Sequence, residues 1–103
     1  MNTAQVILSQ IKSLDPKALF AWGAKELVNT GSGLKFKSSG MTRWKGQVNI
    51  VYNEGTDLYD IEFFRIRKYE IKMDAKVTDV FVEDLVSVID AQVGWNQFNR
   101  NKF

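Results

Sequence analysis

The chain has 103 residues, of which 45% are apolar and 25% are charged, a composition typical of one globular domain and unlike that of disordered chains. It contains no cysteine and no histidine, which excludes disulfides, thiolate nucleophiles, cysteine-ligated zinc and histidine-based catalysis. The net charge of +2 is too small to indicate a nucleic-acid partner by itself.

Two helices are expected at the N-terminus. Thr3 is a candidate cap for the first helix, in which Ile7 and Ile11 share a face. An Asp-Pro pair then breaks the chain, and a second helix is predicted over residues 16–28. This reading places Gly23 inside the second helix, where close approach of a neighbouring element usually offsets the cost of a glycine.

Alternation of apolar and polar side chains predicts strands over residues 34–37, 44–53 and 57–65. The turn at 53–56 contains a glycine, which suits a hairpin. Alternation continues over residues 68–73, but no glycine or proline precedes it. The region from 57 to 73 is therefore either a hairpin of two strands or one long bent strand.

The last predicted element is a helix over residues 82–93, followed by a C-terminal tail over 95–103 that is expected to be partly disordered. We expect one domain over residues 1–94. The fold class is α+β, in which two N-terminal helices precede an antiparallel meander of three to four strands and a C-terminal helix packs on one sheet face. The predicted core comprises Ile11, Phe20, Leu27, Phe36, Val48, Ile50, Tyr52, Ile61, Phe63, Ile71, Leu85 and Ile89.

The opposite sheet face is expected to be polar and to face water or a hydrophilic partner. The same alternation assigns to it Lys35, Lys37, Gln47, Asn49, Asp60, Glu62, Lys68, Glu70 and Lys72.

One cluster of basic residues surrounds a tryptophan. Residues 35–76 carry nine Lys and Arg against six Asp and Glu. Basic side chains beside an exposed aromatic ring can track a phosphate backbone and stack a base. The alternative is that Trp44 caps the core while the lysines protect an edge strand from pairing with other chains. The candidate nucleic-acid-binding residues are Lys35, Lys37, Arg43, Trp44, Lys45, Arg65, Arg67 and Lys68.

A remote alternative is a metal-dependent nuclease. Glu70 and Lys72 have the spacing of the E-x-K half of a two-metal nuclease motif, and Asp57 or Asp60 could supply the upstream acid. Alternating Glu and Lys on the wet face of a strand gives the same pattern by chance, so we predict no catalytic residue, no metal site and no cofactor.

The order of helices and strands is similar to that of the double-stranded RNA-binding domain, in topology alone. The lysine-rich start of that family's last helix would fall on residues 82–85, which are acidic here, and this departure argues against RNA binding by that mode.

Three stretches carry a second resemblance, at residues 21–27, 34–46 and 56–60. They read AWGAKEL, LKFKSSGMTRWKG and TDLYD, and they resemble small uncharacterised proteins of gut Bacteroides genomes and their phages or mobile elements. The likeness implies a bacterial or phage intracellular setting. It implies no activity, so no functional residue is carried over from that group.

These observations favour a cytoplasmic protein that is not an enzyme and that acts as a protein-interaction module, through a protein partner or self-association. Self-association would use an exposed strand edge or the aromatic C-terminal tail. The alternative is nucleic-acid binding through the basic cluster. No membrane partner is expected, because the chain has no basic flank before a long apolar run and no apolar run long enough to span a bilayer.

Overall fold

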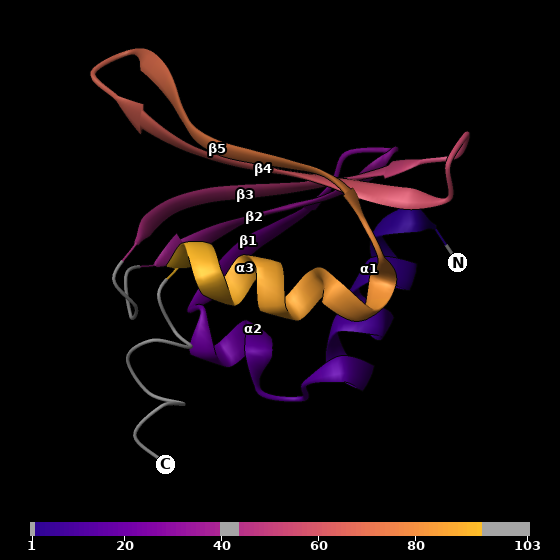
Figure 1. Ribbon diagram of the computed structural model, residues 1–103. Helices are drawn as coiled ribbons and strands as arrows, with labels where there is room; N and C mark the ends of the chain where they lie inside the picture. The colour runs from indigo at the N-terminus through magenta and orange to yellow at the C-terminus, as the bar shows by residue number, and fades with distance from the viewer. Residues whose placement is uncertain (1, 40–43, 94–103) are drawn as a thin grey trace.

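The computed structural model describes residues 2–39 and 44–93 (Figure 1). Nine elements follow one another along the chain. They are α1 (Thr3–Leu14), α2 (Ala18–Ala21), β1 (Ala24–Asn29), β2 (Gly33–Ser39), β3 (Lys45–Asn53), β4 (Leu58–Arg67), β5 (Glu70–Val80), the 3-10 helix η1 (Val82–Asp84) and α3 (Leu85–Val93).

The five strands form one antiparallel sheet in the order β1-β2-β3-β4-β5, and the three α-helices lie against one face of it (Figure 1). The α+β class, the meander and the C-terminal helix are confirmed. The sheet has five strands in place of the expected three to four. The region from 57 to 73 is part of a long hairpin of β4 and β5, so the single bent strand is excluded.

The predicted second helix is wrong over most of its length. α2 ends after one turn, because Gly23 adopts a left-handed φ of 62° and its N–H bonds to the carbonyl of Phe20. A glycine in this conformation ends a helix, so Gly23 terminates α2 and does not lie within it. Residues 24–29 then pair with β2 as the edge strand β1.

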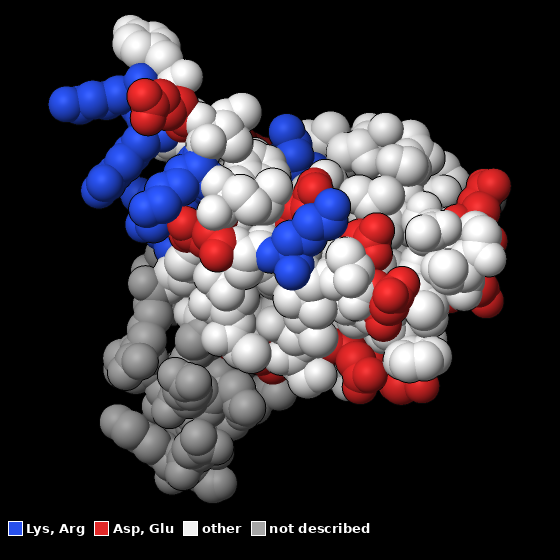
Figure 2. Space-filling model, turned by 45° about the horizontal axis from the view of Figure 1, so that its top comes forward, with Lys and Arg blue, Asp and Glu red and all other residues white. Residues whose placement is uncertain are grey.

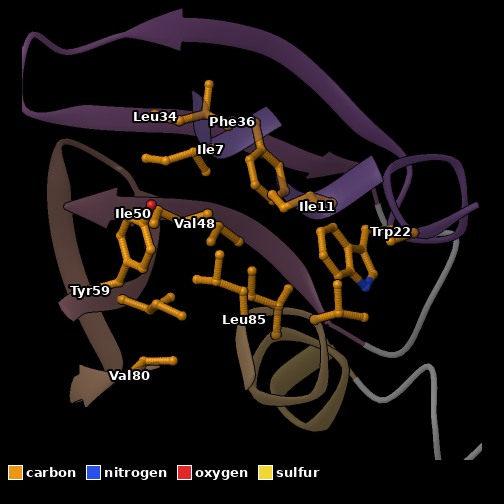
Figure 3. Close-up of a cluster of buried hydrophobic side chains, with 14 of the residues drawn as sticks. Ile7, Ile11, Trp22, Leu34, Phe36, Val48, Ile50, Tyr59, Val80 and Leu85 are labelled. Carbon is orange, nitrogen blue, oxygen red and sulfur yellow. The ribbon is translucent and has the colours of Figure 1, made fainter. Parts of the chain in front are cut away.

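The core lies between the sheet and the helices (Figure 3). Its largest members include Trp22, which stacks on Phe36 with ring centroids 5.9 Å apart. The indole N–H of Trp22 donates a 2.7 Å hydrogen bond to the buried carboxylate of Asp90 on α3. The predicted core members that are buried are Ile11, Phe36, Val48, Ile50, Ile61, Phe63, Leu85 and Ile89.

Four predicted core residues are not fully buried. Phe20 is 77% exposed and Leu27 47% exposed, because the helix that would have turned both toward the sheet ends before Gly23. Tyr52 is half-buried at the end of β3. Ile71 is 70% exposed, and the reason lies in the strand that carries it.

β5 contains a bulge at Asp74. Phe63 pairs with Ala75 while the next residue, Phe64, pairs with Met73, so Asp74 is an extra residue on β5. An extra residue reverses the alternation of side chains along a strand. Ile71 and Met73 therefore face away from the helices, although unbroken alternation would have given them the face of Ala75. The same reversal places Glu70 and Lys72 on the helix side, contrary to the expected polar face.

The remaining polar-face residues on β2, β3 and β4 are exposed or half-buried, as expected. Asn49 Nδ2 donates a 2.9 Å hydrogen bond to Glu62 Oε1, and Lys76 Nζ lies 3.7 Å from Glu62 Oε2. The predicted C-terminal tail over 95–103 lies outside the described residues.

Candidate nucleic-acid interface

The hairpin of β4 and β5 projects beyond the helices at one end of the sheet (Figure 1). β3 and β4 pair as far as Gln47 and Phe64, and beyond that pair the two strands part. A hollow of about 540 Å³ lies at this point, lined by residues 45–47 and 65–67 together with Lys37 from β2. The hollow thus joins the neighbouring strands β2 and β3 to the distant segment 65–67 of β4.

Four basic residues line the hollow, and no acidic residue does: Lys37, Lys45, Arg65 and Arg67. By strand alternation Lys37 and Lys45 belong to the outer face of the sheet, and Arg65 and Arg67 to the helix side, so the hollow lies at the margin between the two faces. Within residues 2–39 and 44–93, neither Lys45 nor Arg67 takes part in an ion pair. Lys37 Nζ lies at 4.0 Å from Glu26 Oε2, a loose contact between exposed side chains. These cations are therefore available to an anionic partner.

Arg65 is held by the bulge residue. Its Nε lies 2.7 Å from Asp74 Oδ2, and its Nη2 donates a 3.1 Å hydrogen bond to Asp74 Oδ1. The same carboxylate accepts a 2.8 Å hydrogen bond from the indole N–H of Trp44. The hydrogen bond from Trp44, followed by the hydrogen bond and charge of Arg65, lowers the pKa of Asp74, although its burial acts in the opposite direction. The ionised side chain of Asp74 therefore holds Trp44 and Arg65 together at the base of the hairpin.

Trp44 does not line the hollow. It directly precedes β3, is partly buried, and packs edge-on against Phe63 with ring centroids 5.8 Å apart. Its indole N–H bonds to Asp74, and its ring covers part of the core, as in the alternative in which Trp44 caps the core. Gly46 pairs with Ser38 of β2 in regular register. A Cβ at Gly46 would lie 2.6 Å from the Trp44 ring, so the glycine makes room for the indole.

The structure brings together only part of the predicted cluster. Lys37, Lys45, Arg65 and Arg67 share the hollow, whereas Lys35 on β2 lines a separate, smaller hollow of about 330 Å³ that also includes Glu26. Lys68 is exposed in the turn at the hairpin tip. Arg43 lies outside the described residues.

Sequence reasoning missed three features of this end. Gln47 and Ile66 also line the hollow, and Lys72 pairs with Arg65 across the hairpin. Tyr69 is fully exposed at the tip, although its alternation with the neighbouring lysines suggested a strand. The basic residues of β2 and β4 were the sequence signal for the hollow. Whether they line one hollow depends on the point at which the pairing of β3 with β4 ends, which the sequence does not show.

The acids of the nuclease hypothesis lie at opposite ends of the hairpin. Asp60 is near the start of β4, and Glu70 pairs with Arg67 at its end, seven residues or about 23 Å along the strand. One metal ion cannot bind both. Across the part of the chain that the structure describes, no three acidic side chains are placed to hold a metal ion.

The opposite end of the sheet is acidic. Residues 53–60 and 79–84 contain six carboxylates and no Lys or Arg. Figure 2 shows basic side chains gathered on the projecting hairpin and acidic side chains toward the other end. The molecule therefore presents its charges in two separate groups, which a net charge of +2 conceals.

Comparison of the chain with models of known protein families, with curated proteins and with solved structures found no match. None of the described helices is both long and apolar enough to cross a membrane.

Proposed function

We propose that the protein binds the phosphate backbone of a nucleic acid in the hollow between β3 and the projecting hairpin. The observation that carries this proposal is that four basic residues from three strands line one hollow whose lining includes no acidic residue. Binding to a phosphate backbone releases the counterions that surround the nucleic acid. This release makes the interaction favourable and independent of the base sequence. The acidic end would be repelled by the same polymer, so the charge separation also orients the approach.

The exposed ring of Tyr69 adds a second contact. It lies at the tip of the hairpin beside Lys68, with Arg67 one residue further along. A ring presented this way can stack on an unpaired base while the neighbouring cations hold phosphates. We therefore expect single strands to bind more tightly than duplexes of the same length.

A salt titration tests the proposal. Fluorescence anisotropy with labelled single-stranded and duplex oligonucleotides gives the affinity at several salt concentrations. Arg65 is already neutralised by Asp74, so the three other cations predict that log K falls with log salt with a slope of about −2 for single strands and about −3 for duplexes. Absence of any salt-dependent affinity contradicts the proposal.

A pair of matched double variants locates the site. Lys37→Gln with Lys45→Gln removes two cations from the hollow, and the magnitude of the slope should fall by about 1.4 for single strands. Lys12→Gln with Lys17→Gln removes the same charge from exposed positions on the helix side. Equal losses in the two variants would mean that net charge alone attracts the polymer.

A second candidate function is binding of a protein partner with an acidic, apolar-centred surface. Ile66, Ile71 and Met73 are 55%, 70% and 49% exposed on the outer side of the hairpin, where Ile66 and Ile71 pair directly. This apolar strip lies beside the cations of the hollow, so the two together complement such a partner.

Strand addition at a sheet edge, which the sequence also suggested for self-association, is less favoured. β1 has an irregularity near Glu26, and β5 is interrupted at Asp74 and again between Val77 and Val80. Bulges of this kind disfavour pairing with another chain. The cations beside the strip make both candidates sensitive to salt, so variants of the strip separate them. Ile71→Thr with Met73→Thr should abolish the protein contact and leave nucleic-acid affinity unchanged, because neither residue lines the hollow.

A further inference from the structure

A second hollow, of about 380 Å³, lies at the acidic end of the molecule, remote from the cations of the first. α1 contributes Thr3, Val6 and Gln10 to its lining. Most of the remaining wall consists of Tyr52 from β3, Tyr59 from β4 and Asp57 from the turn between these strands. The hollow is large enough for a small ligand or one side chain of a partner.

The two tyrosines form an aromatic corner. Their ring centroids are 5.5 Å apart and their planes meet at 56°, so they present two walls at an angle. Tyr59 is fixed because it is buried and its hydroxyl donates a 2.5 Å hydrogen bond to Gln10 Oε1. The hydroxyl of Tyr52 donates to Asp57 Oδ1, which ties the carboxylate to the aromatic wall.

Asp57 is held in place by its backbone as well. Its φ is 58°, in the left-handed region that aspartate and asparagine tolerate, and its N–H donates a 2.8 Å hydrogen bond to the carbonyl of Asn53. A carboxylate fixed beside two aromatic rings is the arrangement that recognises organic cations, since the rings attract the cation through their π faces.

The electrostatic surroundings support a positive ligand. The segments that close this end carry six carboxylates and no Lys or Arg. The N-terminus of α1 also lies at this end, and its free backbone N–H groups would favour an anion. A capping box satisfies some of these groups. Asn2 Oδ1 accepts a 2.8 Å hydrogen bond from the N–H of Gln5, and Gln5 Oε1 accepts a 3.0 Å hydrogen bond from the N–H of Asn2.

Both phenols stay neutral at physiological pH. The hydrogen bond to Asp57, desolvation and the nearby negative charges raise the pKa of Tyr52. Burial raises the pKa of Tyr59, although its hydrogen bond to Gln10 acts in the opposite direction. The charge that would pair with a cation is therefore on Asp57, and the rings contribute neutral π faces.

We propose that this hollow binds an organic ammonium group on a short alkyl chain, with the nitrogen between Asp57 and the tyrosine corner. The alkyl part would lie along Val6 and Val82, which also line the hollow. The ammonium group is either that of a free amine or that of a lysine side chain, and both carry the same recognised group.

Titration followed by backbone amide NMR tests this assignment. Butylammonium chloride, with ionic strength matched by sodium chloride, should shift the amide signals of Asp57 and Tyr59 in a saturable manner. Butanol has the same chain without the charge and should bind at least about tenfold more weakly. Nα-acetyl-lysinamide distinguishes the sources: tighter binding than butylammonium indicates a lysine side chain, and weaker binding indicates a free amine.

Variants locate the site within the acidic end. Asp57→Asn keeps a residue that tolerates the left-handed conformation and should weaken butylammonium about tenfold, while Tyr52→Leu, which removes a wall, should weaken it about fivefold. Asp79→Asn is the matched control, since Asp79 also has a left-handed φ, of 56°, and does not line the hollow. It should change the affinity less than about twofold.

Three results would overturn the assignment: no saturable shift, equal affinity for butanol, or equal weakening by Asp57→Asn and Asp79→Asn. If Asp57→Asn fails to fold, Tyr52→Leu compared with Tyr52→Phe decides, because phenylalanine keeps the aromatic wall and leucine does not.

Discussion

β4 and β5 form one hairpin, but its two halves differ in how far their apolar side chains are buried. Where α1 and α3 cover the sheet, Ile61 and Phe63 are fully buried. Where the hairpin projects beyond the helices, Ile66 and Ile71 lie on the outer face, which no described helix covers, and are mostly exposed among basic residues. The apolar side chains of β4 change sides at the adjacent Phe63 and Phe64, so the helix side of the projecting half carries Arg65 and Arg67 instead. Alternation thus selects the side of a strand, whereas burial depends on whether another element covers that side.

The largest expected effect comes from comparing two isoleucines of β4. Ile61→Ala creates a cavity in the core and should lower the free energy of unfolding by about 2–5 kcal/mol. Ile66→Ala removes the same atoms from the projecting half, where it should cost less than about 0.5 kcal/mol. Urea denaturation followed by circular dichroism measures both. Equal effects would mean that the projecting half is covered in the folded protein.

Gly46→Ala tests the packing of Trp44, which contacts Phe63 in the covered half of the hairpin and bonds to Asp74 at the base of the projecting half. The added methyl group would lie 2.6 Å from the indole and 2.8 Å from the carbonyl oxygen of Phe64, so the ring or the strands must move. A loss of about 1–3 kcal/mol is expected from this overpacking. Gly55→Ala is the control, because its added Cβ meets only an Asn53 side-chain oxygen at 3.3 Å. Comparable losses would contradict the position of Trp44 over Gly46.

Asp74→Ala tests the carboxylate at the base of the hairpin. It leaves Trp44 and Arg65 without their shared acceptor, and we expect a loss of about 1–3 kcal/mol, with Glu70→Ala nearly neutral as the exposed control. Thermal unfolding measures the difference. No loss in Asp74→Ala would show that the carboxylate does not secure the hairpin.

The contribution of Asp74 should depend on pH. Because the folded state lowers its pKa, the stabilisation is full above the ordinary aspartate pKa of about 3.9 and declines as the pH falls through the lower folded value. The stability difference between wild type and Asp74→Asn should therefore be constant near neutrality and shrink in acid. A difference that grows in acid would reverse the sign and refute this account.

The smallest effect on stability is expected for Tyr69→Ala, since Tyr69 is fully exposed at the tip. Stability should change by less than about 0.5 kcal/mol, while binding of single strands should weaken by about 1–3 kcal/mol. Binding of duplexes, measured by the same anisotropy assay, should hardly change. Tyr69→Phe keeps the ring and should bind as wild type; equal weakening by both variants would exclude stacking.

Several features followed from the sequence because they rest on local patterns. The alternation of Val48 and Ile50 identified β3 and its buried face, and the spacing of Leu85 and Ile89 identified the buried face of the last helix. The sequence also grouped the basic residues Lys37, Lys45, Arg65 and Arg67, and these four line one hollow. Their role in binding remains a prediction.

The tertiary structure alone decided what depends on pairing and cover. The sequence of β1 fits a helix as well as a strand, and only the left-handed turn at Gly23 and pairing with β2 select the strand. The bulge at Asp74 reverses the side of Ile71 without interrupting the alternation in the sequence. The hollow of Tyr52, Asp57 and Tyr59 had no sequence signal, since α1 supplies one wall from a distant part of the chain. Local patterns record the side on which a residue lies in its own element, whereas contacts between elements are set by the packing of the whole chain.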